Sequence, residues 1–208
     1  MSPEVLYTFC ITCLVLIITP GPDLLYVVSQ SITKGQKYGY AIVLGQAGGL
    51  LFHLTLFAFG ISTLITNSEI AFQTVKILGA IYLLWLSYKV FQEDALLQIE
   101  NKETTDEAYS FMSFMRKGLL MNIMNPKVMM FFLALFPSFV SGQVTTIRKE
   151  VFILGSVFIT ETLIVCFVIC AIAAKLASAI QGNRAINLFL KWLQIIVFTG
   201  LALYLLSS

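Results

Sequence analysis

The stretch Thr19-Pro20-Gly21-Pro22-Asp23 interrupts the first long apolar segment of this chain of 208 residues. A proline inside a helix removes one backbone donor and clashes with the preceding turn, at a cost of about 3 kcal/mol. Residues 5–18, which precede the stretch, rise only about 21 Å as a helix, whereas the hydrocarbon core of a bilayer is about 30 Å thick. If the segment enters a membrane, its helix is predicted to break inside that membrane.

The composition requires a membrane. Hydrophobic residues make up 58% of the chain and charged residues only 12%, and the mean hydropathy is +0.88. Soluble domains are about 45–50% apolar and about 25% charged, so a soluble core of this size would not bury so much apolar surface. The 13 basic residues are scattered and the net charge is only +2, which predicts no nucleic-acid partner.

The hydropathy pattern predicts an all-α membrane protein with six transmembrane helices. A spanning helix needs about 20 mostly apolar residues. The first segment has no basic residue before it and no small-x-small cleavage site after it, so we interpret it as a retained helix and not as a signal peptide. The six segments are residues 5–31, 38–65, 70–91, 114–140, 151–179 and 186–206.

The two halves of the chain are related in pattern. The fourth segment is interrupted at Asn125-Pro126, as the first is at residues 19–22. Three helices per half place the second half upside down relative to the first, which predicts two inverted three-helix repeats with broken helices 1 and 4. We expect one transmembrane transporter domain over residues 1–208, with repeat one at about 1–92, an acidic cytoplasmic loop at about 92–110 and repeat two at about 111–208.

The distribution of Lys and Arg predicts the orientation, because cytoplasmic loops are enriched in these residues. Three loops on one side carry nine of them, against three (Lys76, Arg148 and Lys149) on the other. We therefore expect both termini to face away from the cytoplasm. The nine are Lys34, Lys37, Lys89, Lys102, Arg116, Lys117, Lys175, Arg184 and Lys191.

The first break is a candidate transport site, formed by Pro20, Gly21, Pro22 and Asp23. Carbonyl groups freed by a break must face protein or a wet cavity and not lipid. The helix that starts after the break points free N–H groups and a positive dipole end toward that cavity, which suits a substrate carboxylate. A charge at membrane depth is costly, so Asp23 is predicted to hold a substrate ammonium or a proton. The alternatives are a purely structural kink and a helix-capping role for Asp23.

The second break supplies Asn122, Asn125, Pro126 and Lys127 as its candidate counterparts. The proline drives Asn125 out of helical geometry. Lys127 is expected to pair with Asp23 or to bind a substrate carboxylate; the alternative is that it extends to a membrane interface.

Two further ionisable residues interrupt apolar segments, His53 in the second and Glu161 in the fifth. Together with Asp23 they are the candidates for proton coupling, because a histidine titrates near neutral pH and a buried carboxylate is costly. The alternatives are a packing role for His53 and an interfacial position for Glu161.

The remaining features favour packing. Gly45 and Gly49 form a G-x-x-x-G spacing that permits close contact with the broken helix and also permits a homodimer. Cys10, Cys13, Cys166 and Cys170 lie in apolar segments. Cys10-x-x-Cys13 has the redox spacing, but no neighbouring charge or glycine activates it.

These motifs resemble those of the lysine-exporter (LysE) superfamily, particularly its threonine/homoserine (RhtB-type) branch. The resemblance covers nearly the whole chain outside the acidic loop, although Ser87 stands where a glycine is expected and the last two segments agree mainly in hydropathy. It implies a six-helix bundle in the bacterial inner membrane, amino-acid export and drive by the proton gradient. The matching residues are the Thr19–Asp23 stretch, Gly35, Gly39, Gly45, Gly49, His53, Gly79-Ala80-Ile81-Tyr82-Leu83, Gly118, Asn122, Asn125-Pro126-Lys127 and Phe131-Phe132.

We therefore predict an exporter of threonine, homoserine, leucine or related neutral amino acids that works by proton antiport. Its partners are the substrate, protons and the bilayer. We expect no enzymatic activity, no catalytic residue, no cofactor and no metal. Two alternatives remain at this stage, a membrane thiol–disulfide electron carrier and a metal-ion exporter.

Overall fold

The computed structural model describes residues 2–61, 69–92, 110–140, 147–175 and 184–207, and their regular elements are all helical. This confirms the all-α prediction. The acidic loop at residues 93–109 lies outside the described residues. The elements are α1 (Pro3–Ile18), α2 (Pro22–Thr33), α3 (Gln36–Leu56), the π-helix η1 (Phe57–Ile61), α5 (Glu69–Gln92), α6 (Phe111–Ile123), α7 (Pro126–Met130), the π-helix η2 (Phe131–Leu135), the 3-10 helix η3 (Phe136–Phe139), α8 (Ile147–Lys175) and α10 (Arg184–Ser207).

Both predicted breaks are present. Thr19 precedes Pro20 and is extended, with a ψ of 118°, as the residue before a proline prefers. Pro22 then begins α2, which is bent by 58° from α1. Asn125 is likewise extended, and the helical stretch that begins at Pro126 is bent by 46° from α6.

Two of the described helical stretches, Gln36–Phe59 and Ile147–Ala173, are long and apolar enough to cross a membrane. If each bent pair is also one span, the described chain contains up to four. The apolar parts of α5 and α10, Ile77–Gln92 and Lys191–Leu206, are shorter. The fold is therefore that of an all-α membrane protein, and the count of six spans stays a prediction.

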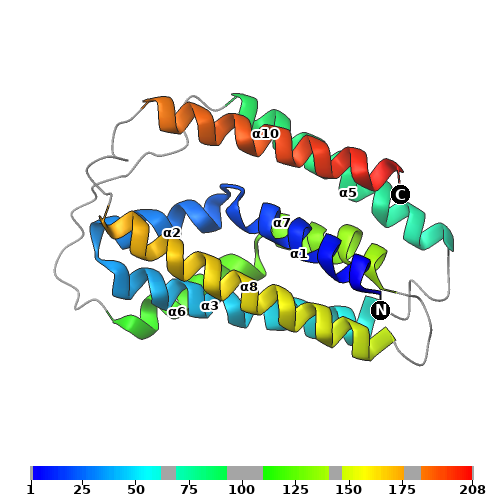
Figure 1. Ribbon diagram of the computed structural model, residues 1–208, viewed down its shortest axis with the longest axis horizontal. Coiled ribbons are helices and arrows are strands. Elements are labelled where there is room, and N and C mark those ends of the chain that lie inside the picture. The colour runs from blue at the N-terminus through cyan, green and yellow to red at the C-terminus, as the bar shows by residue number, and fades with distance from the viewer. Residues whose placement is uncertain (1, 62–68, 93–109, 141–146, 176–183, 208) are drawn as a thin grey trace.

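The helices are arranged as an inverted repeat. Each half has the order bent pair, long helix and 24-residue helix. In Figure 1, α2, α3 and α5 run opposite to α6, α8 and α10, respectively. The packing shows the same symmetry. The long helix of each half packs on the bent pair of the other half, α3 on α6 and α8 on α1. Equivalent helices also pair with each other, α3 with α8 and α5 with α10.

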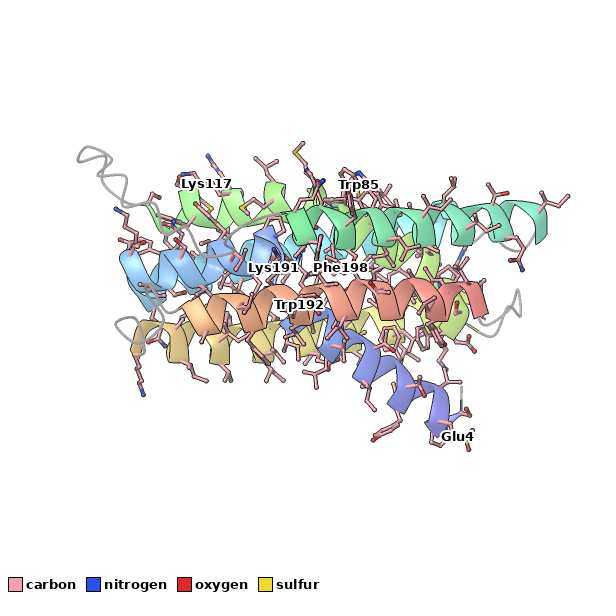
Figure 2. The ribbon with its side chains drawn as sticks, turned by 90° about the horizontal axis from the view of Figure 1, so that it is seen from above. Glu4, Trp85, Lys117, Lys191, Trp192 and Phe198 are labelled. Carbon is pink, nitrogen blue, oxygen red and sulfur yellow. The ribbon has the colours of Figure 1, made fainter. Side chains whose placement is uncertain are left out.

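Both described ends of the chain lie at the same end of the bundle, where α1 begins and α10 ends (Figure 1). The opposite end gathers the helix ends that flank the three predicted basic loops. Figure 2 shows Lys117 toward that end and Glu4 at the other. The basic residues on these described helix ends therefore share one end, and its identity as the cytoplasmic end stays a prediction.

A close backbone contact joins α3 to α6. A Cβ atom on Gly45 would overlap the carbonyl oxygen of Met115, and one on Gly118 would overlap the carbonyl oxygen of Ile42. The predicted contact of the G-x-x-x-G helix with a broken helix is confirmed. Because Gly45 and Gly49 are buried against α6 inside the bundle, this spacing gives no support to a homodimer.

We predict that Gly45→Ala destabilises the protein because backbone atoms of α6 would have to move away. Overpacking of this kind costs about 1–3 kcal/mol. Gly48→Ala is the matched control, since its Cβ would meet only the flexible end of Leu119, at 3.2 Å. Thermal unfolding in detergent should give a lower Tm for Gly45→Ala alone. Equal Tm values for the two variants would contradict this contact.

Candidate functional site

The end of α1 leaves carbonyl groups without a helical donor. The carbonyl of Leu16 would normally accept a bond from the N–H of residue 20, but Pro20 has no N–H. The carbonyl of Thr19 is also free of a helical partner, because the chain is extended there. Both groups are deep in the protein, where an unmet carbonyl is costly.

The ammonium group of Lys127 binds both of these carbonyls. Lys127 Nζ donates to Leu16 O at 3.2 Å and to Thr19 O at 3.1 Å. It also lies 3.5 Å from Asp23 Oδ1, and the two side chains are only 5% and 16% exposed. A residue of the second half thus closes the break in the first half, and the predicted Lys127–Asp23 pair is present.

The second break is closed in the reciprocal way. Pro126 deprives the carbonyl of Asn122 of its helical donor, and His53 Nε2, from α3, lies 3.2 Å from that oxygen. Asn125 N also donates to it at 3.0 Å. The side chain of Asn125 accepts a bond from the backbone N–H of Lys127 at 3.0 Å and so caps α7.

A small cavity lies between the two breaks, with about 30 Å³ open to the centres of water molecules. That space holds a water molecule or two, which is much less than an amino acid occupies. Both signs of charge and two neutral amides line it beside apolar side chains and a thiol. The lining residues are Leu16, Ile17, Asp23, Leu24, Gln46, Leu50, Asn122, Lys127, Val128, Phe158, Thr162 and Cys166.

Two acceptor atoms at this site make no hydrogen bond to a described residue, although one of them is ion-paired with Lys127. Among the described residues, Asp23 Oδ1 and Asn122 Oδ1 are buried without a hydrogen bond. Gly21 leaves room for the charged pair, because its Cβ would lie 2.6 Å from Asp23 Oδ1 and 3.3 Å from Lys127 Nζ. Gln46 Nε2 donates to the backbone carbonyl of Asp23 at 3.3 Å and ties α3 to the first break.

The structure separates the predicted site residues into two groups. Asp23, Asn122 and Lys127 line the cavity, while Pro20, Gly21, Pro22, Asn125 and Pro126 shape the two breaks around it. His53 and Glu161 are not lining residues. His53 stacks on Phe132, and Glu161 is half-buried on α8 beside the lining residue Thr162.

Nine of the twelve lining residues were not predicted from the sequence, and among them are Gln46 of α3 and Phe158, Thr162 and Cys166 of α8. Gln46 carried a usable signal, because it lies seven residues before His53 and therefore on the same face of one helix. The three residues of α8 follow one another at intervals of four, but they lie in a helix that carries apolar residues on every side.

A family model described as LysE type translocator matches residues 14–208. The chain belongs to this family. As a LysE-type protein it is a transporter and not an enzyme, and its resemblance to the superfamily is confirmed. All four of its cysteines are free thiols, and its described residues bring no three His, Cys, Asp or Glu side chains together as a metal site.

Relatives of this LysE-type protein include transporters named for their substrate. A homoserine/homoserine lactone efflux protein of Salmonella typhi is 28% identical over 184 residues, which cover 88% of this chain and 87% of the relative. An uncharacterized membrane protein of Vibrio cholerae is 30% identical over 182 residues, or 88% and 87% of the two chains. The uncharacterized membrane protein YrhP of Bacillus subtilis is 34% identical over 149 residues, or 68% and 70%. No solved structure matches the chain.

We predict that His53→Leu destabilises the LysE-type fold and that His53→Gln largely preserves it. Leucine removes the side-chain donor of Asn122 O, which then keeps only the bond from Asn125 N, and the loss of one such hydrogen bond costs about 0.5–1.5 kcal/mol. Glutamine offers an N–H at a similar reach. The measurement is thermal unfolding in detergent for both variants beside the native protein.

A glutamine variant as unstable as the leucine variant would contradict the capping role. A stable His53→Gln protein that has lost only its proton-driven transport would instead identify His53 as the proton carrier, since glutamine does not titrate.

Proposed function

We propose that this protein exports small zwitterionic amino acids, such as threonine, homoserine or leucine, from the bacterial cytoplasm by proton antiport. The observation that supports this most is the buried Lys127–Asp23 pair, which joins the two breaks. The name of the Salmonella typhi relative, a homoserine/homoserine lactone efflux protein, points to the same substrate class.

The pair matches the two charges of a zwitterion. An ammonium group needs acceptors of the kind that Lys127 Nζ now occupies: Leu16 O, Thr19 O and the Asp23 carboxylate. A carboxylate needs a cation, which Lys127 provides once it leaves them. We propose that the substrate inserts between the two side chains, with its ammonium on Asp23 and its carboxylate on Lys127 and the free N–H groups at the start of α2. The start of α7 is less suited, because Asn125 already caps it.

Insertion requires the cavity to widen. Its open space of about 30 Å³ is only water-sized, and the ions are 3.5 Å apart. Separating a buried ion pair without replacement costs about 3–5 kcal/mol. A zwitterion offsets that cost at both ends, whereas a simple amine or a simple acid offsets it at only one.

Proton coupling follows from competition at Asp23. A protonated Asp23 does not attract a substrate ammonium, and a bound ammonium disfavours protonation, so the carboxylate carries one or the other. Alternate occupancy of one group is what an antiporter requires. One proton moving through 100 mV supplies about 2.3 kcal/mol, which corresponds to a substrate gradient of roughly fifty-fold.

We propose the bacterial inner membrane as its location, with the basic ends of the helices in the cytoplasm and both termini outside. Labelling of cysteines introduced near each terminus tests this orientation. A thiol reagent that does not cross the membrane should react with them when it is added outside intact cells.

We predict that Asp23→Asn lowers proton-driven uptake of threonine or homoserine into everted vesicles at least tenfold. Asparagine neither titrates nor neutralises an ammonium group. Glu161→Gln is the comparison, since Glu161 is also a membrane carboxylate with a buried oxygen that accepts no bond among the described residues, but it does not line the cavity. It is expected to keep uptake within about twofold of the native protein.

Uptake that survives Asp23→Asn but is lost in Glu161→Gln would move the coupling role to α8. Absence of amino-acid uptake by the native protein, at a confirmed level in the vesicle membrane, would contradict the proposed function itself.

A further inference from the structure

Three residues of α8 form one wall of the cavity. Phe158, Thr162 and Cys166 follow at intervals of four, so they share one face of the helix, and they are 3%, 7% and 4% exposed. All three line the cavity. The Lys127–Asp23 pair comes from α7 and α2, so α8 contributes no charge to this lining.

The wall therefore has no charge with which to bind the ammonium or the carboxylate of a substrate. If Lys127 and Asp23 take the carboxylate and the ammonium, the substrate side chain is left to the neutral lining. Most of that lining is hydrocarbon, including Leu24, Leu50 and Phe158. Thr162 is the one hydroxyl among the lining residues, and its position on the wall makes it a polar contact for a side chain of similar length.

The hydrogen bonding of Thr162 determines whether its hydroxyl would donate to a substrate or accept from it. Thr162 Oγ1 donates its proton to the carbonyl of Phe158 at 2.8 Å. The oxygen keeps lone pairs that accept a further bond. The complement is a donor, and a hydroxyl group on a substrate side chain is one.

We propose that Thr162 is a specificity-determining residue that selects short hydroxylated amino acids, such as threonine, serine and homoserine, over aliphatic amino acids of the same shape. This proposal rests on the proposed function and adds to it a residue that sets the preference among its substrates. Threonine and valine are the decisive pair, because they differ only by a hydroxyl in place of a methyl group. One net hydrogen bond separates two such ligands by about fivefold.

The chain supplies a matched control for this test. Thr160 lies on the same helix and makes the same bond to its own backbone, donating to Ser156 O at 2.8 Å. It is exposed on the outside of the bundle and does not line the cavity. Replacing Thr160 by valine thus makes the same chemical change in α8 without touching the wall.

The experiment uses the full-length protein in proteoliposomes loaded with threonine. Exchange of radiolabelled threonine is measured against increasing external threonine or valine, and the ratio of the two half-inhibiting concentrations is the readout. We expect the native protein, Thr160→Val and Thr162→Ser to prefer threonine about fivefold. We expect Thr162→Val to bring this preference to within twofold.

An unchanged preference in Thr162→Val, or an equal loss in Thr160→Val, would overturn the proposal. If Thr162→Val does not reach the liposomes, Thr162→Ala removes the same hydroxyl and is judged by the same ratio. Failure of the proposed function looks different, because the native protein would then exchange neither amino acid and no ratio would exist.

Discussion

The structure depends on two carbonyl groups that proline deprives of their helical donor. A proline at one position deprives the carbonyl four residues earlier of its helical bond, here at Leu16 and Asn122. Water meets such a group in a soluble protein, but a membrane interior offers none. Lys127 binds Leu16 O and His53 binds Asn122 O. Each of these side-chain donors comes from the opposite half of the chain, so each repeat helps to close the broken helix of the other, and Asn125 N adds a local bond to Asn122 O.

This exchange explains why the polar groups gather at one place. The closing donors must approach the broken ends, so they pull α7 toward the end of α1 and α3 toward the end of α6. Gly45, Gly49 and Gly118 make the second approach possible by removing side-chain bulk between α3 and α6. Gly21 leaves space in the same way beside Asp23 and Lys127. The charged pair is therefore a consequence of closing the helices as well as a means of binding a ligand.

Sequence reasoning located the two breaks, the pairing of Asp23 with Lys127 and the close contact of the glycine-rich helix, because proline, buried charge and glycine each have strong local rules. It did not identify the wall on α8. That helix carries apolar residues on every side, so its hydropathy does not indicate which face turns inward. Glu161 drew attention as the costly residue, yet the rotation of α8 brings its neighbour Thr162 to the cavity instead. The partner of His53 was also missed, although Pro126 pointed to the carbonyl of Asn122 four residues before it.

The position of Lys127 also limits how the site can open. Its backbone belongs to the short helix α7, which continues directly into η2, so a movement that withdraws the ammonium from α1 involves both elements. η2 packs on α5, where a Cβ atom on Gly79 would lie 2.5 Å from Cβ of Ala134. α5 is in turn paired with α10 through Ser87, which hydrogen-bonds with Thr199 at 3.0 Å, and Figure 2 shows Trp192 and Phe198 along α10 in this outer pair. The outer helices contribute nothing to the cavity lining, but they form the surface against which α7 and η2 must move. The outer helices therefore affect the site only through packing, which restricts the movement of α7, the half-helix that carries the Lys127 ammonium.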